Sequence, residues 1–366
     1  MGSHESYEVI SVHKVASSTA GRVRGREVRV IDQSDVRAGD IVVVLALEEK
    51  SVYDQLELVG GRMAKISKGD VIAGTIGARQ ALKGFVGHAP RLLAAGDVVH
   101  ILNLGGIVGL CTSANKDYGQ PLKVKVLGVA VGEDGRTLSI RDGAVPAAAA
   151  LDRAVPPLVV VAGSCMNAGK TRAACEIVHQ LNLRGAKLGA LKVSGVACLR
   201  DTLNMQDHGA VAALSFLDAG EPSTAGFEDL APLAKGLLNA LAARNPGLDA
   251  IVVELGDGIV GGYGVGSIYA DAEIVARTAC HVMCANDLVA AWGAKELSER
   301  LGRAVDIMSG PATDNEVGEQ YVERDLGVVA ANARTSGAKL ADAVEAKLKA
   351  FKAAAAALPA AFAVAE

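Results

Sequence analysis

One stretch near the middle of the chain constrains the fold more than any other. Residues 158–171 read Leu-Val-Val-Val-Ala-Gly-Ser-Cys-Met-Asn-Ala-Gly-Lys-Thr. The first four are apolar and three of them are β-branched, which is typical of a buried parallel strand. A loop of small residues follows and ends in Gly169-Lys170-Thr171, after which apolar residues recur at helical spacing as far as Leu183. This order of strand, glycine-bounded loop and helix predicts a phosphate-binding loop.

The residue types of this loop suit phosphate chemistry. Backbone N–H groups at a helix N-terminus cradle phosphate oxygens, a lysine reaches the outer phosphates, and a threonine hydroxyl holds Mg²⁺. The usual pattern has a glycine where this chain has Ser164, and the glycine stands one position earlier. We expect the following residues to contact the nucleotide: Gly163, Ser164, Cys165, Met166, Asn167, Ala168, Gly169, Lys170, Thr171 and Arg172.

The amino-acid composition restricts the kinds of partner and the cell compartment expected for this chain. The chain has 366 residues, a formal net charge of −4 and only 3% aromatic residues. It lacks the basic and aromatic stretches that bind nucleic acids, so we expect no nucleic-acid partner. No apolar run is long enough to span a membrane, and Pro359 interrupts the alanine-rich end. Scattered cysteines and a polar N-terminus predict a reduced, cytoplasmic protein without a membrane partner.

The N-terminal region predicts a mainly-β domain. Short runs of valine and isoleucine alternate with turn signals, and a Gly-Asp phrase recurs at residues 38–42, 68–72 and 95–99. Each copy reads as a turn that feeds a strand. We expect a small barrel or sandwich with one helical piece near residues 78–83.

A segment with the composition of a domain linker lies between this region and the phosphate loop. Residues 143–157 contain three prolines and an alanine run, which is typical of a domain linker. We therefore predict a smaller, barrel-like β domain at residues 1–148 and an α/β domain at residues 149–366.

Strand-like and helical patterns alternate after residue 158, which predicts a mostly parallel sheet with helices on both faces. After the first strand, the expected strands are 187–193, 250–255, 279–284, 305–309 and 326–331. The expected helices are 172–183, 230–243, 288–301 and 336–358.

The phosphate loop resembles that of the dethiobiotin synthetases, in which five residues separate the glycine from Gly-Lys-Thr. The end of the second strand, residues 191–195, is similar to that family's Lys-Pro-Val-Ala-Ser-Gly, and residues 252–258 are similar to its Val-Glu-Gly-Ala-Gly-Gly. The chain also resembles an uncharacterised group of P-loop proteins with Met-Asn-Ala-Gly-Lys-Thr loops and an Asp-Ala-Gly stretch, found here at residues 218–220. The resemblance covers residues 158–310 and leaves the N-terminal domain outside.

The resemblance implies a P-loop enzyme that uses ATP and Mg²⁺ to activate a small-molecule substrate. The implied reaction is phosphoryl transfer to a carboxylate or carbamate, of ligase or kinase type. Lys170, Lys192 and Glu254 would be catalytic, and Mg²⁺ would be held by Thr171, Glu254 and an aspartate after the second strand. Two aspartates are available, Asp201 and Asp207, and Asp201 is favoured because it comes sooner. We also expect a homo-oligomer, namely a dimer.

Glu254 and Lys192 are candidate site residues on the sequence pattern alone, apart from the family resemblance. Glu254 follows an apolar run, and a lone acid there is costly to bury without a partner. The carboxyl ends of parallel strands are where ligands bind in open α/β sheets. The same argument applies to Lys192 at the end of a neighbouring strand, so both residues are predicted to serve the site.

Other motifs receive a structural interpretation. Residues 256–261 satisfy Gly-x-Gly-x-x-Gly, but residues 262–266 are too glycine-rich to open a helix, so we expect a loop over the site. Cys165 is interpreted as a small loop residue, in preference to a nucleophile or redox switch. Cys280 and Cys284 are interpreted as core cysteines.

A second function remains open, a nucleotide-switched assembly protein or a metallochaperone-type GTPase. Guanine-binding proteins usually carry Asn-Lys-x-Asp, and residues 285–287, Ala-Asn-Asp, lack the lysine. The sequence therefore favours ATP over GTP.

Overall fold

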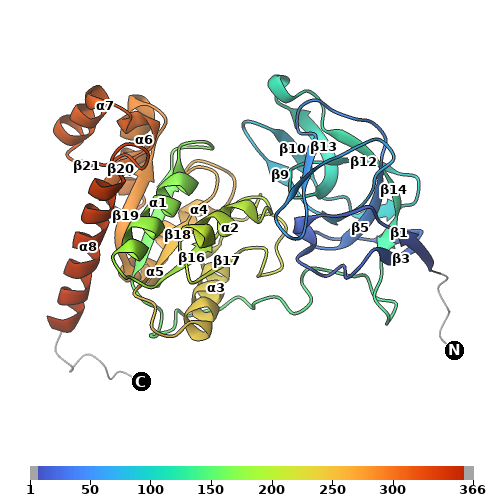
Figure 1. Cartoon of the computed structure of the whole chain (residues 1–366), viewed down its shortest axis with the longest axis horizontal. Helices are drawn as coiled ribbons and strands as arrows, with labels where there is room; N and C mark the ends of the chain where they lie inside the picture. The colour runs from blue at the N-terminus through green and yellow to red at the C-terminus, as the bar shows by residue number, and fades with distance from the viewer. Residues whose placement is uncertain (1–6, 358–366) are drawn as a thin grey trace. The chain divides into compact units, whose positions relative to one another are not determined.

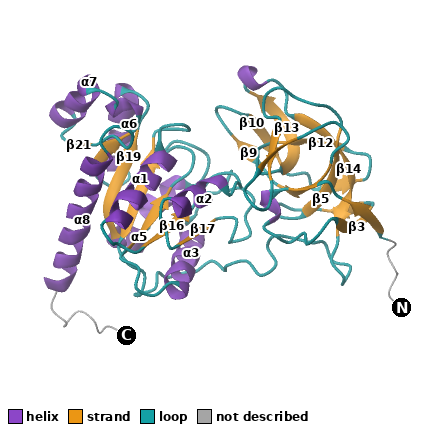
Figure 2. Cartoon of the chain, in the orientation of Figure 1, coloured by secondary structure: helices purple, strands orange, loops and turns teal. Residues whose placement is uncertain are grey.

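A computed structural model describes residues 7–357 and divides the chain into two compact units (Figure 1). The β unit contains the chain up to Pro146 together with residues 195–203 and 215–227. The α/β unit contains residues 147–194 and 204–214 and the chain from Glu228 onward. Figure 2 shows that helices are concentrated in the α/β unit. The predicted division at residue 148 did not include the two later segments that join the β unit.

A closed ring of strands forms the centre of the β unit. Strand β14 pairs with β5, β5 with β8, β8 with β13, β13 with β12, and β12 again with β14. This closure confirms the mainly-β, barrel-like expectation. The bounds of the ring strands are β5 (Ile41–Ala46), β8 (Val71–Ile76), β12 (Val98–Ile101), β13 (Ile107–Ala114) and β14 (Leu122–Ala130).

Shorter elements extend the ring. Strand β3 pairs with β14, and β1 pairs with β3. These elements are β1 (Glu8–Ser11), β2 (Lys14–Val15), η1 (Ser17–Thr19), β3 (Glu27–Ile31), β4 (Gln33–Asp35), β6 (Gln55–Glu57), β7 (Met63–Lys65), β9 (Arg79–Gln80), β10 (Phe85–His88), β11 (Leu92–Ala94) and η2 (Lys116–Tyr118).

The helical piece expected near residues 78–83 is wrong, because this stretch contains strand β9, which pairs with β10. The side chain of Arg79 is buried and donates to the backbone oxygen of Leu102 and to the hydroxyl of Tyr53. These long-range contacts outweigh the local helix propensity.

The recurring Gly-Asp phrase forms the same turn three times. Each aspartate carboxylate accepts a hydrogen bond from the backbone N–H three residues earlier, at 3.0, 2.6 and 2.9 Å (Asp40, Asp70 and Asp97). The preceding glycines have positive φ angles of 100°, 89° and 97° (Gly39, Gly69 and Gly96). Glycine adopts this left-handed conformation at little cost. The prediction that each phrase feeds a strand is confirmed, because β5, β8 and β12 follow.

The α/β unit is built on a sheet with the strand order β17-β16-β18-β15-β19-β20-β21. The pairings from β16 through to β21 are all parallel, which confirms the predicted fold class. The strands are β15 (Leu158–Gly163), β16 (Leu188–Lys192), β17 (Ala212–Ser215), β18 (Ala250–Glu254), β19 (Thr278–Cys284), β20 (Ile307–Ser309) and β21 (Val329–Ala330).

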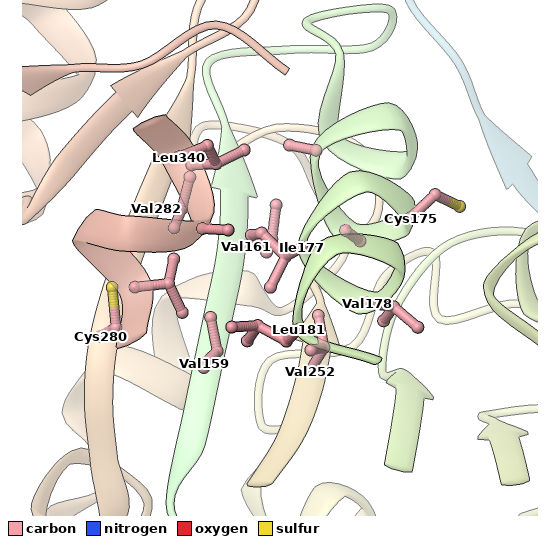
Figure 3. Close-up of a cluster of buried hydrophobic side chains, with 14 of the residues drawn as sticks. Val159, Val161, Cys175, Ile177, Val178, Leu181, Val252, Cys280, Val282 and Leu340 are labelled. Atoms are coloured by element: carbon pink, nitrogen blue, oxygen red, sulfur yellow. The ribbon is translucent and has the colours of Figure 1, made fainter. Parts of the chain in front are cut away.

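Helices cover both faces of this sheet. On one face, Val159 and Val161 of β15 pack with Ile177 and Leu181 of α1, and Leu340 of α8 joins the same cluster (Figure 3). The helices are α1 (Lys170–Leu183), α2 (Arg200–Asp207), α3 (Ala231–Arg244), α4 (Val265–Ala270), α5 (Ala272–Arg277), α6 (Leu288–Arg300), η3 (Pro311–Thr313), α7 (Glu316–Gln320), the π-helical turn η4 (Tyr321–Asp325) and α8 (Gly337–Ala357).

The opposite face is covered by α3, α4 and α5. Val160 lines a small cavity with Ile268 of α4 and Ile274 of α5. A side chain at Gly189 of β16 would press on Leu241 of α3. Successive strand residues point to opposite faces, so a strand covered on both sides is apolar throughout, as β15 is. Among residues 7–357, none of the helices combines the length and apolarity that a membrane crossing requires.

Candidate functional site

The phosphate-loop segment leaves the sheet at Gly163 and enters helix α1 at Lys170. Positive φ angles of 62° at Asn167 and 95° at Gly169 turn the chain into the helix. A β-carbon at Gly163 would lie 2.9 Å from the Cγ and Cδ atoms of Lys170. The glycine one position earlier than usual therefore has a physical reason, because the lysine side chain passes directly over it.

Lys170 is held within this loop. Its side chain is buried, and Nζ donates a hydrogen bond of 2.7 Å to the backbone oxygen of Cys165. Burial lowers the pKa of Lys170, because it disfavours the charged ammonium, and the nearby charge of Glu254 opposes this shift. An added anion close to Nζ would stabilise the ammonium. The loop thus holds a buried lysine whose charged form an incoming phosphate would favour.

Strands β16 and β18 bring two predicted residues to the same place. Lys192 and Glu254 are direct partners in the parallel register. Glu254 Oε1 accepts a hydrogen bond of 2.7 Å from Thr171 Oγ1, and Lys192 Nζ lies 3.4 Å from the same oxygen. Both members of the Lys192–Glu254 pair are buried. The predicted association of Thr171, Lys192 and Glu254 is therefore present in the fold, whereas their chemical roles stay predictions.

The other oxygen of Glu254 makes this group suitable for a metal ion. Oε2 is buried and has no hydrogen-bond partner among the described residues. A buried carboxylate oxygen without a partner carries a large desolvation cost. Within residues 7–357 no cluster of three or more His, Cys, Asp or Glu residues is suited to a metal. Mg²⁺ needs fewer protein ligands, because it binds through one or two carboxylates together with phosphate oxygens and waters. Glu254 and Thr171 therefore fit Mg²⁺.

The two candidate aspartates lie on one helix. Asp201 is in the first turn of α2, and Asp207 is its last residue. Asp201 belongs to the segment that joins the β unit, whereas Asp207 belongs to the α/β unit. A metal-binding role for either aspartate stays a prediction.

Two segments pack against the loop: the one after β18, which the sequence predicted to lie over the site, and the one after β20, which the sequence did not connect with the loop. A β-carbon at Gly258, just after β18, would lie 2.5 Å from the backbone oxygen of Ser164. Gly310, just after β20, similarly has no room for a side chain beside the backbone oxygen of Ala168. The segment after β18 is thus packed directly against the loop at Gly258. The statement that residues 262–266 cannot open a helix is wrong, because α4 begins at Val265 after Gly264, whose φ is 73°.

Asn332 holds the turn after β20 in place. Its Nδ2 lies 3.1 Å from the backbone oxygen of Gly310 and 2.8 Å from Asp314 Oδ1. Sequence reasoning missed Asn332 and Gly310, although a Gly-Pro pair directly after the predicted strand at residues 305–309 indicated a tight turn.

The polar residues after β19 have structural partners. Asn286 Nδ2 donates to Cys165 Sγ at 3.0 Å, and Asp287 caps helix α6 by accepting from the N–H of Ala290 at 2.8 Å.

Cys280 and Cys284 are buried, and burial raises the pKa of Cys284 to about 12. This burial supports the interpretation of both as core cysteines.

The comparisons with known proteins found similar structures only. No family model and no curated protein matches the chain. A nucleotide-binding protein from Archaeoglobus fulgidus in complex with ADP is 12% identical, with 53% of this chain and 88% of that chain covered and a TM-score of 0.36. The signal recognition particle 54 kDa protein from Aeropyrum pernix in complex with GDP is 16% identical. The match covers 55% of this chain and 50% of that chain, with a TM-score of 0.37. A ParA family ATPase from Chlorobium tepidum is 13% identical, with 55% and 99% covered and a TM-score of 0.29.

The fold assignment rests on the chain's own geometry. The parallel sheet, the turn from β15 into α1 and the pairing of Lys192 with Glu254 are internal observations. Together they describe an α/β unit with the strand, loop and helix of a P-loop protein. The finer resemblance to dethiobiotin synthetases stays a prediction.

Proposed function

We propose that this chain binds a magnesium nucleotide, ATP in preference to GTP, and uses it to activate a small acid. The activation would be phosphoryl transfer to a carboxylate or carbamate. One observation carries the proposal: the Thr171 hydroxyl at the start of α1 and the Glu254 carboxylate at the end of β18 are in contact, 2.7 Å apart. One oxygen of that carboxylate is left without a partner in the described chain.

Each residue has a distinct part in this proposal. The loop N–H groups bind the phosphates, and Lys170 neutralises their charge in the ground state and in the transition state. Thr171 and Glu254 would hold Mg²⁺, and the chemistry that Mg²⁺ supplies when bound is neutralisation of phosphate oxygens. Lys192 lies beside Glu254 and would orient the anionic group of the acid substrate.

One observation favours a second candidate, a nucleotide-switched protein. The chain passes from Lys192 at the end of β16 to a segment of the β unit, beginning at Gly195. A change at the end of β16 on nucleotide binding would therefore reach the β unit through the chain itself. In this alternative, nucleotide turnover serves a conformational change and needs no acid substrate.

Turnover with candidate acids distinguishes the two functions. We expect the purified full chain to release ADP from Mg-ATP faster when a suitable mono- or dicarboxylic acid or a carbamate is added, and to use GTP less well. Substrate-dependent ADP release that is lost in Lys170→Ala supports the enzyme. Release that is the same with and without every acid in the panel would support the switch instead.

We also propose that the chain forms a homodimer. Light scattering on the full chain, with and without Mg-ATP, tests this directly. The expected mass is twice that of one chain, and a single-chain mass under both conditions contradicts the proposal.

A further inference from the structure

A pocket of the β unit contains arginines that the nucleotide chemistry does not use. Its volume is about 390 Å³, and it is lined by Arg22, Arg24 and Arg29 together with Glu27 and Glu133. The pocket lies where β1 pairs with β3, and the backbone oxygen of Arg29 in β3 also accepts a hydrogen bond of 2.9 Å from a backbone N–H after β14. Pockets of this volume are typical of small-molecule sites.

Arg22 is the most informative residue of this pocket. Its Nε is buried and lacks any hydrogen-bond partner in the described part of the chain. A guanidinium carries five N–H donors and stays charged, so a buried donor without a partner is costly. The terminal nitrogens lie beside Gly143, where an added β-carbon would be 3.5 Å from Nη2. Gly143 therefore borders the terminal nitrogens of Arg22, and the donor on Nε has no partner among residues 7–357.

The charges around the pocket are not paired with one another. Three guanidinium groups face two carboxylates, and no ion pair joins any of them within residues 7–357. Arg136, on the neighbouring turn, shows the contrast, because its Nε donates to Asp134 at 2.6 Å. Arg29 lies over the ring of Tyr7, 5.2 Å from its centroid. The lining thus has one more guanidinium than carboxylates, and the Arg22 Nε donor is without a partner among the described residues, beside the apolar side chains of Val28 and Leu138.

We propose that this pocket binds a small organic anion, whose carboxylate or phosphate group accepts hydrogen bonds from Arg22. A guanidinium presents parallel N–H donors that match both kinds of oxyanion. The apolar lining would contact the aliphatic part of the molecule, and Arg24 and Arg29 would add attraction. This site belongs to the β unit and does not depend on the nucleotide function proposed for the α/β unit.

The test follows the Nε–H resonance of Arg22 by NMR in the full chain, with Mg-ADP present so that a phosphate site elsewhere is occupied. The resonance is assigned by its loss in Arg22→Gln. Succinate and inorganic phosphate are titrated separately. We expect a saturable shift with at least one probe, and the tighter probe identifies the group as carboxylate or phosphate. Absence of a saturable shift with either probe up to about 10 mM, which corresponds to negligible affinity, would overturn the proposal.

Two variants separate a built site from general electrostatic attraction. Arg22→Gln lacks the Nε–H resonance, so binding to the variants is followed at the backbone amides of Val28 and Leu138 in the pocket lining. Arg22→Gln should weaken binding of the tighter probe by at least about tenfold, because it removes charge-assisted hydrogen bonds. Arg26→Gln is the matched control, because Arg26 is exposed in the same segment and lies outside the pocket lining. It should weaken binding by less than about twofold, as expected for a screened surface charge. Equal weakening by both variants contradicts the proposal. If Arg22→Gln does not fold, Arg22→Lys replaces it with the same criterion, because it keeps the charge and removes the parallel N–H donors.

Discussion

The two units bury a carboxylate in opposite ways. In the α/β unit, Glu254 shares one oxygen with Thr171 and Lys192 and leaves the other without a partner among the described residues. In the β unit, Glu57 is equally buried, but both of its oxygens are used. Oε1 accepts from Cys198 Sγ and the N–H of Arg200, and Oε2 accepts from Ser17 Oγ and the N–H of Leu199.

This difference separates a binding group from a structural one. A buried carboxylate with four donors has replaced its lost hydration with protein hydrogen bonds, so Glu57 fixes the segment 195–203 within the β unit. A buried carboxylate with an unpaired oxygen is stabilised further when a ligand approaches. Burial alone would not have distinguished Glu57 from Glu254, whereas the hydrogen bonds of each oxygen do.

The largest expected effect is in the α/β unit, at Lys170. Lys170→Ala should reduce nucleotide turnover by at least about 10³-fold, because it removes a positive charge that acts on the transferring phosphate. Steady-state ADP release measures this effect. Lys187→Ala, at an exposed lysine of the same unit, should leave turnover unchanged. Normal turnover in a folded Lys170→Ala protein would remove the basis for the phosphate-loop interpretation.

The matching change in the β unit is Glu57→Ala. It should lower the free energy of unfolding of this unit by about 3–5 kcal/mol, because it leaves buried donors unpaired. The amides of Leu199 and Arg200 should also lose protection from hydrogen exchange. Glu49→Ala, at a half-exposed position, should change stability by less than about 0.5 kcal/mol. Unchanged protection at Leu199 would show that Glu57 does not anchor this segment.

Acid should destabilise the α/β unit through His281. This residue is buried, its Nδ1 donates to the backbone oxygen of Ala304, and its Nε2 accepts from the Tyr269 hydroxyl. Burial lowers the pKa of His281 to about 4, so the unfolded chain binds more protons between that value and 6.5. Stability is therefore full above pH 6.5 and falls by about 3 kcal/mol as the pH drops through 4.

Hydrogen exchange in β19 between pH 7 and pH 4 measures this loss. His281→Gln should flatten the pH dependence over that range, although its stability at neutral pH is lower. His13→Gln, at an exposed histidine, should keep the wild-type dependence. An unchanged slope in His281→Gln would assign the acid sensitivity to another group.

The sequence predicted those parts of the fold and the site that are determined by residues close together in the chain. The strand and loop at residues 158–171, the Gly-Asp turns and the apolar run before Glu254 are local patterns, so they were predictable. Gly310 and Asn332 were missed, and the close contact of Gly258 with Ser164 was not predicted, because the partners of these residues in the phosphate loop and its support are remote in sequence. The same reason explains the wrong helix at residues 78–83, where a buried arginine and a strand partner overrode local propensity. Part of the expected last helix, at Leu358, lies outside the described residues.

The central claim is that Glu254 completes a Mg²⁺ site beside the phosphate loop. Glu254→Gln preserves size and removes the charge, so it should reduce Mg²⁺-dependent turnover by about 10²-fold. Glu299→Gln, at an exposed residue of α6, is the matched control and should behave as wild type.

The most direct measurement is the affinity for ATP in the presence and absence of Mg²⁺, by calorimetry, in wild type and Glu254→Gln. We predict that Mg²⁺ strengthens binding to the wild type, and that this strengthening is lost in Glu254→Gln while the metal-free affinity stays the same. Equal strengthening by Mg²⁺ in both proteins would contradict the account.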